Sequence, residues 1–78
     1  PDLEWGMMKA KTLGNIAVCY AGEGNLKMAF QTYTEQEKLL TELLRAFPDE
    51  EKLKRKLKTA KSRKLNIGST IESYAVEK

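Results

Sequence analysis

Histidine is absent from the sequence, and Cys19 is its single cysteine. A disulfide within one chain needs two cysteines, and the common zinc sites need several cysteine or histidine ligands, so neither can stabilise this chain. No residue next to Cys19 in the sequence is a base that would activate its thiol. We therefore expect no enzyme activity, no cofactor and no bound metal, and a protein of the reducing cytoplasm.

Long apolar runs and strand-like segments are also absent. No apolar stretch reaches the roughly 20 residues that cross a bilayer, and the N-terminus lacks the basic start and apolar core of a signal peptide. The first residue is not methionine, so we expect a fragment of a longer protein. Only two prolines and five glycines occur in 78 residues, and no segment alternates apolar and polar residues as a strand does. These absences predict one all-α domain over residues 1–78.

Apolar residues recur at intervals of three and four over residues 3–21 and again over 25–47. This spacing places them on one face of a helix. The turn 22–25, Gly-Glu-Gly-Asn, lies between the two segments, where glycine suits the end of one helix and asparagine the start of the next. Gly14 lies inside the first segment at a cost of about 1 kcal/mol relative to alanine, so we expect it to allow a close contact between helices.

The second half of the chain contains two further helix boundaries. Pro48 ends the second helix, because proline disfavours a helical conformation in the residue before it. Gly68 suits a helix end, and Ser69 and Glu72 have the spacing of a capping box, in which each side chain bonds the other residue's backbone amide. The helices predicted in this way span about 3–21, 25–47, 49–66 and 70–77.

Seven residues of the first hairpin match the pattern of a known helical repeat: Leu13, Ile16, Ala17, Tyr20, Gly24, Ala29 and Tyr33. Together they resemble a tetratricopeptide repeat. The resemblance implies that Ala17 and Ala29 let two antiparallel helices approach closely, and that the large residues of the set fill the space between them. It also implies a right-handed bundle of three to four helices, built from antiparallel hairpins.

Part of the same pattern is similar to a second family. The segment 24–33, with Gly24, Asn25, Leu26, Ala29 and Tyr33, also resembles the first hairpin of the microtubule interacting and trafficking domain, a three-helix bundle of about this length. The predicted fourth helix favours the tetratricopeptide repeat. Both resemblances imply an adaptor or scaffold that binds a peptide or helix of another protein in a groove between helices.

Charge is unevenly distributed along the chain. Residues 1–50 hold five Lys/Arg and eight Asp/Glu, whereas residues 51–78 hold nine and three, so the two parts carry net charges of −3 and +6. Because the first helix of each repeat lines the concave surface in such proteins, we predict a groove along the first and third helices and an acidic protein partner. The predicted partner-binding residues are Asn15, Cys19, Lys54, Lys58 and Lys61.

Other interpretations of the sequence stay open. The basic third helix could bind nucleic acid or acidic protein tails instead, because clustered lysine and arginine attract anions and release the cations condensed on phosphates. Trp5 and the apolar end of the second helix could form a homodimer contact, and the domain would then be a structural capping or dimerisation piece of a helical solenoid. Glu37 is the one polar residue on the second apolar stripe, and we expect it to pair with a lysine of the third helix.

Overall fold

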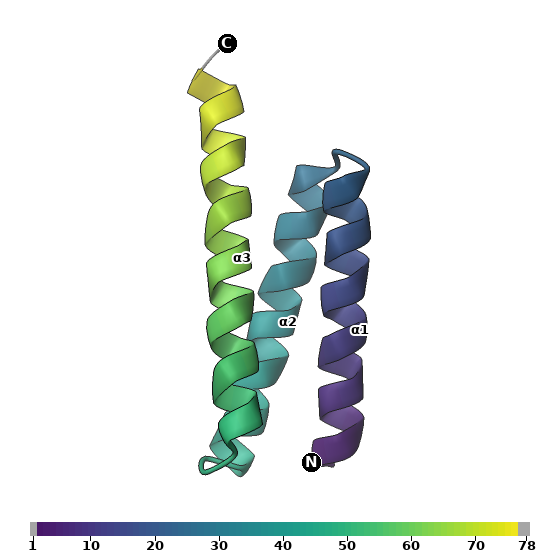
Figure 1. Cartoon of the computed structure of the whole chain (residues 1–78), viewed down its shortest axis with the longest axis vertical. Coiled ribbons are helices and arrows are strands. Elements are labelled where there is room, and N and C mark those ends of the chain that lie inside the picture. The colour runs from purple at the N-terminus through teal and green to yellow at the C-terminus, as the bar shows by residue number, and fades with distance from the viewer. Residues whose placement is uncertain (1, 77–78) are drawn as a thin grey trace.

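The computed structural model describes residues 2–76, and three α-helices account for most of them. α1 spans Leu3–Gly22, α2 spans Leu26–Ala46 and α3 spans Glu51–Val76. Consecutive helices run in opposite directions, and α2 lies between α1 and α3 (Figure 1). α2 packs against both neighbours, whereas α1 and α3 have almost no contact with each other. No strand occurs within the described residues, so the all-α prediction is confirmed.

The turn between α1 and α2 forms as the sequence predicts. Gly24 has φ +80°, in the left-handed region that glycine enters without a steric cost. The Asn25 amide donates a hydrogen bond to the Tyr20 carbonyl at 2.9 Å, which satisfies a carbonyl that the helix end leaves free. The Asn25 side chain then accepts a hydrogen bond from the Met28 amide at 3.2 Å. Asn25 is therefore the N-cap of α2.

α1 packs against α2 through its smallest residues. The buried residues of α1 are Gly6, Ala10, Gly14 and Ala17. A Cβ atom on Gly14 would lie 2.7 Å from Nε2 of Gln36, and this nitrogen donates a hydrogen bond to the Ala10 carbonyl at 2.9 Å. The absence of a side chain at Gly14 thus lets α2 hydrogen-bond directly to the backbone of α1, which confirms the close contact predicted there.

The positions of the repeat pattern differ in burial. The buried ones are Ala17, Ala29 and Tyr33, and the half-buried ones are Leu13 and Tyr20. Ile16 is 42% exposed, so the prediction that it fills the space between the first two helices is wrong. The stripe of small residues is the part of α1 that faces α2, and Ile16 lies about 100° around the helix from Ala17, which turns it away from α2.

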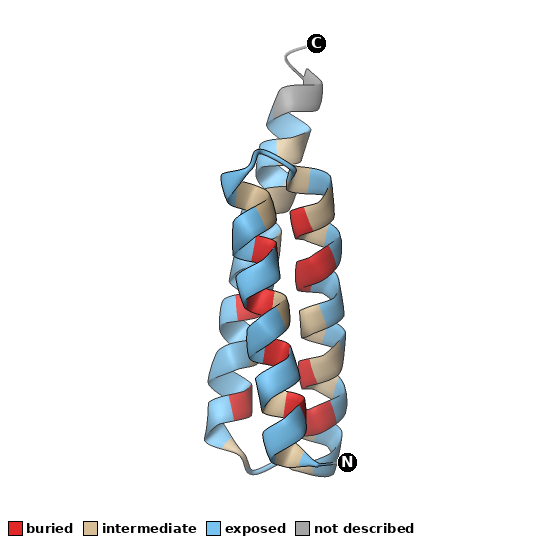
Figure 2. Cartoon of the chain, turned by 90° about the vertical axis from the view of Figure 1, so that its right-hand side faces the viewer, coloured by how far each residue is buried: buried red, intermediate tan, exposed pale blue. Residues whose placement is uncertain are grey.

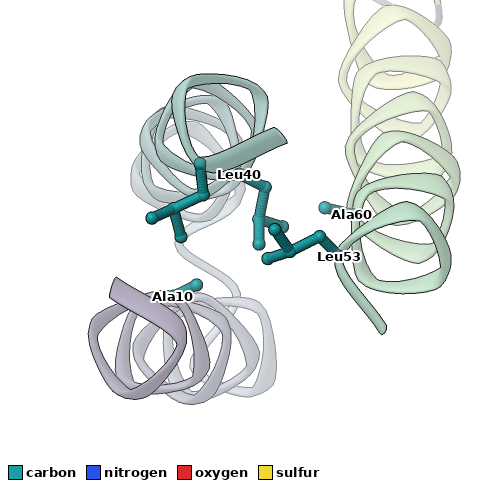
Figure 3. Packing of buried hydrophobic residues seen from close by; sticks show 5 residues of the cluster. Ala10, Leu40, Leu53 and Ala60 are labelled. Atoms are coloured by element: carbon teal, nitrogen blue, oxygen red, sulfur yellow. The ribbon is translucent and has the colours of Figure 1, made fainter. Parts of the chain in front are cut away.

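The hydrophobic core is formed by all three helices. It contains Ala10 from α1, Leu40 and Leu43 from α2, and Leu53 and Ala60 from α3. Figure 3 shows side chains from the three helices meeting at Leu40. Leu40 and Leu53 have no exposed surface, so together they fix both α1 and α3 to α2.

α3 continues through Gly68 without a break. The prediction that a separate fourth helix covers 70–77 is therefore wrong, and the end of that range lies outside the described residues. A Cβ atom on Gly68 would lie 3.3 Å from the ring of Phe30, so this glycine serves the close packing of α3 on α2. The Thr70 hydroxyl donates to the Asn66 carbonyl at 2.9 Å, a bond that side chains make inside a continuing helix.

Gly6 lies against the core leucine Leu43. A Cβ atom on Gly6 would lie 2.6 and 2.7 Å from the two Cδ atoms of Leu43, which is 3% exposed. We expect Gly6→Ala to lower the free energy of unfolding by about 1–3 kcal/mol, because Leu43 must move within a packed core. Urea unfolding followed by circular dichroism measures the change.

The matched control for this substitution is Gly22→Ala, because a Cβ atom on Gly22 meets no atom within 4 Å. We expect that variant to be as stable as the parent or slightly more stable. If Gly6→Ala had the same free energy of unfolding as the parent, the close contact between Gly6 and Leu43 would not constrain the side chain of Leu43 as we infer.

Candidate functional site

A cleft of about 300 Å³ lies between α1 and α3, with α2 at its floor. It is open because both helices pack on α2 and scarcely touch each other. A hollow therefore exists where the sequence predicts a groove, between the first and third helices. Its lining residues are Lys11, Gly14 and Asn15 from α1, Gln36 from α2, and Arg55, Lys56, Thr59, Ala60 and Arg63 from α3.

The charged residues of the cleft all have the same sign. They are Lys11, Arg55, Lys56 and Arg63, and no carboxylate lines the cleft. All four are exposed, and none takes part in the ion pairs found among residues 2–76. A cleft lined by one sign of charge attracts ligands of the opposite sign.

The floor of the cleft is made of small residues and one amide. Gly14 and Ala60 are buried there, so the backbone of a bound segment could come close to α1 and α3. The Oε1 atom of Gln36 is buried and has no hydrogen-bond partner within the described part of the chain. An unpaired buried acceptor costs about 1–3 kcal/mol, so a rearrangement that brought a donor to Gln36 on binding would be favourable.

A second hollow of about 410 Å³ lies between α2 and α3, and its charges are mixed. Lys64 Nζ lies 3.4 Å from Oε2 of Glu37, and both side chains are 27% exposed. The same nitrogen lies 5.5 Å from the centre of the Phe30 ring, a cation–π distance. The predicted pairing of Glu37 with a lysine of the third helix is confirmed. Because Lys64 already has a carboxylate partner, this hollow attracts an anion less than the cleft does.

The structure separates the five predicted partner-binding residues. Asn15 lines the cleft. Cys19 is exposed on α1 outside it. Lys54 pairs with Glu51 of its own helix at 3.4 Å, and Lys61 lines the second hollow. Lys58 is exposed and lines neither hollow.

The four basic residues that line the cleft were not predicted from the sequence. A helical projection of α3 around its buried residues Leu53 and Ala60 places Lys56 and Arg63 on one flank, and Lys54 and Lys61 on the other. That projection could have grouped the lysines correctly from the sequence. Which flank faces α1, however, depends on how α3 packs on α2, and the sequence pattern contains no signal for that.

The described residues contain no group of three or more Cys, Asp or Glu side chains placed to hold a metal ion. Among these residues there is also no helix with both the length and the apolar character of a bilayer span. Comparisons of the chain with protein families, curated proteins and solved structures gave no match.

Proposed function

We propose that this domain is a protein-interaction module that binds an acidic peptide or helix of a partner protein in the cleft between α1 and α3. The observation that carries the proposal is the set of four cationic side chains around a cleft with no carboxylate. A volume of about 300 Å³ is at the small end of ligand sites, which suits a few side chains of a docked segment.

The spacing of the cationic residues suits a helical partner. Lys56 and Arg63 are seven residues apart on α3, which is about 10 Å along the helix axis. Glutamates seven residues apart on one face of a partner helix have the same separation. Lys11 approaches from the opposite wall, so a helix lying along the cleft would meet cations on both sides.

The two family resemblances support the same function. Tetratricopeptide repeats and microtubule interacting and trafficking domains both resemble the first hairpin, and both resemblances imply binding in a groove between helices. The fourth helix that favoured the tetratricopeptide repeat does not form separately, since α3 is continuous over Glu51–Val76. We propose a relation to this general type of helical adaptor without a preference between the two families.

The test compares two variants with the same change in net charge. Lys56→Glu/Arg63→Glu reverses two cleft charges, and Lys54→Glu/Lys58→Glu reverses two charges of α3 outside the cleft. The probe is a fluorescein-labelled, alanine-based helical peptide with glutamates seven residues apart, titrated in a fluorescence anisotropy assay. We expect the cleft variant to bind at least about 10-fold more weakly, a loss of about 1.4 kcal/mol, and the control less than about threefold more weakly.

Equal losses in the two variants would mean that the peptide responds to net charge alone, and the cleft would then not be the binding site. Circular dichroism of both variants checks that the helices are intact. The two residues substituted in each variant are exposed in the structure. We therefore expect the free energy of unfolding to change by less than about 0.5 kcal/mol.

Nucleic acid is the competing ligand, because α3 carries eight lysine and arginine residues. None of the residues that line the cleft is aromatic, so the bases of a single strand would find no ring to stack on. A DNA oligonucleotide in the same anisotropy assay distinguishes the two ligands. Tighter binding of DNA than of the acidic peptide, with a steep loss between about 50 and 200 mM salt, would overturn the proposal in favour of nucleic acid.

A further inference from the structure

The arginine residues of α3 are distributed differently from its lysine residues. α3 carries two arginines, Arg55 and Arg63, and six lysines. Both arginines line the cleft between α1 and α3, whereas Lys56 is the one lysine of α3 that does so within the described residues. Exposure does not account for the difference, because α3 is exposed along most of its length (Figure 2). The wall that α3 contributes to the cleft is therefore richer in arginine than the rest of its surface.

Arginine and lysine bind anions in different ways. The guanidinium group is planar and donates two parallel N–H bonds to neighbouring oxygens of one ligand group, whereas the ammonium group is a compact point charge. A carboxylate has two oxygens, and one arginine in this bidentate arrangement uses both. A phosphate monoester has three terminal oxygens and a charge of about −1.5 to −2 at pH 7. It can therefore bind two arginines at once.

The two arginines lie on either side of Thr59. Arg55, Thr59 and Arg63 are spaced four residues apart, so they lie on one face of α3. The arginines are about 12 Å apart along the helix axis, and each would cover about 6 Å to meet the other above Thr59, which is within the length of an extended arginine side chain. Lys11 and Asn15 line the same cleft from α1. A ligand group above Thr59 would thus meet donors from both walls.

The hydroxyl group of Thr59 is available to a ligand. Five other threonines of the described helices donate their hydroxyl proton to the carbonyl four residues earlier, and they are Thr12, Thr32, Thr34, Thr41 and Thr70. Thr59 is the threonine of residues 2–76 that makes no such bond. Its side chain is exposed and lines the cleft. The hydroxyl can therefore donate to an acceptor oxygen of a bound group.

We infer that the acidic group taken by the cleft is a phosphorylated side chain, seated over Thr59 between Arg55 and Arg63. The inference rests on the proposed peptide binding and specifies the partner more closely, as a peptide or helix that carries a phosphorylated residue. Binding then depends on modification of the partner, because an unmodified serine at the same position brings no charge to the four cations of the cleft.

The test uses the acidic peptide of the anisotropy assay with one glutamate replaced by phosphoserine. A third peptide carries two adjacent glutamates at that position, which supply about the same charge as phosphoserine. We expect the parent to bind the phosphoserine peptide at least about 10-fold more tightly than either glutamate peptide, a difference of about 1.4 kcal/mol. Thr59→Val, which keeps the branched shape and removes the hydroxyl, should bind the phosphoserine peptide about 3–10-fold more weakly than the parent does.

Replacing arginine by lysine separates bidentate binding from charge. Arg55→Lys/Arg63→Lys keeps both charges, so binding of the glutamate peptides should stay within about threefold of the parent, while the preference for phosphoserine should fall below about threefold. The matched control is Arg45→Lys, because Arg45 is exposed on α2 and lines neither the cleft nor the second hollow. We expect this control to keep the full preference for phosphoserine.

The outcomes distinguish this inference from the proposed function. Equal affinity for the phosphoserine and glutamate peptides would overturn the inference and leave the proposed function in place, whereas no binding of any acidic peptide would overturn both. A phosphoserine preference that persists in Arg55→Lys/Arg63→Lys would contradict the role of the two arginines. Inorganic phosphate is titrated as a competitor. If it displaced the phosphoserine peptide at concentrations near the Kd of that peptide, the cleft would be a site for the free ion and not for a phosphorylated partner.

Discussion

Leu40→Ala is expected to lower the free energy of unfolding by about 2–5 kcal/mol, the usual cost of truncating a fully buried leucine. Leu40 has no exposed surface, and it packs in the cluster that contains Ala10 of α1 and Leu53 of α3. The cavity left by the substitution would thus border all three helices (Figure 3). A domain of this length has a total stability of about 4–12 kcal/mol, so the substitution removes a large part of it.

Urea unfolding followed by circular dichroism measures this loss, with Leu65→Ala as the matched control. Leu65 is 72% exposed, so the same chemical change there should alter the free energy of unfolding by less than about 0.5 kcal/mol. Similar effects at the two positions would contradict the assignment of Leu40 to the core. A lower slope of the unfolding transition in Leu40→Ala would mean either that its native or denatured state has a different compactness or that its unfolding is no longer two-state.

Leu53→Ala should cost a similar amount, about 2–5 kcal/mol, but its effect should be confined to one helix. Leu53 and Ala60 are the buried hydrophobic residues of α3 within the described side chains, and α3 has almost no contact with α1. Loss of the leucine therefore weakens the attachment of α3 to α2 and leaves the contacts between α1 and α2 in place.

Amide hydrogen exchange measured residue by residue distinguishes local from global opening. In Leu53→Ala we expect the amides of α3 to exchange much faster than those of α1 and α2, whereas Leu40→Ala should speed exchange in all three helices. Equal acceleration in the three helices of Leu53→Ala would mean that the domain opens as a single unit, contrary to the separation of α1 and α3.

The first hairpin was predictable because its signals are local. The left-handed Gly24 and the N-cap Asn25 act on the backbone within a few residues of themselves, so the sequence contains all that the turn needs. α2 was predicted over 25–47 and is found at Leu26–Ala46. Pro48 ended it as expected, because the restriction that proline imposes on its predecessor does not depend on tertiary structure.

The end of α3 was not predictable, because the same local signals have two meanings. Gly68 and the pair Ser69 and Glu72 match a helix end followed by a capping box, yet α3 passes through them. Gly68 is where the ring of Phe30 approaches α3, and Phe30 lies 38 residues earlier in the chain. A glycine that allows close packing and a glycine that ends a helix look the same in the local sequence. Only the contact with a residue that distant in the chain distinguishes the two.

The location of the site was partly predictable, but of its residues only Asn15 was predicted. A groove between the first and third helices was predicted from the resemblance to helical repeats, in which the first helix of each repeat lines the concave surface. The three lysines chosen from the sequence all lie outside the cleft, because each flank of α3 carries basic residues and the choice between flanks depends on how α3 packs on α2. Ile16 was misplaced for a related reason, since the glycines and alanines of α1 give a weak signal for the face that is buried.

The lack of contact between α1 and α3 has a consequence for folding speed. Nearly all tertiary contacts join helices that are neighbours in the sequence, so each hairpin can form outward from its own short turn. Helical bundles, whose contacts are mostly of this kind, fold in roughly microseconds to milliseconds. The α1–α2 and α2–α3 hairpins can form in either order around α2, and the cleft is complete once both have formed.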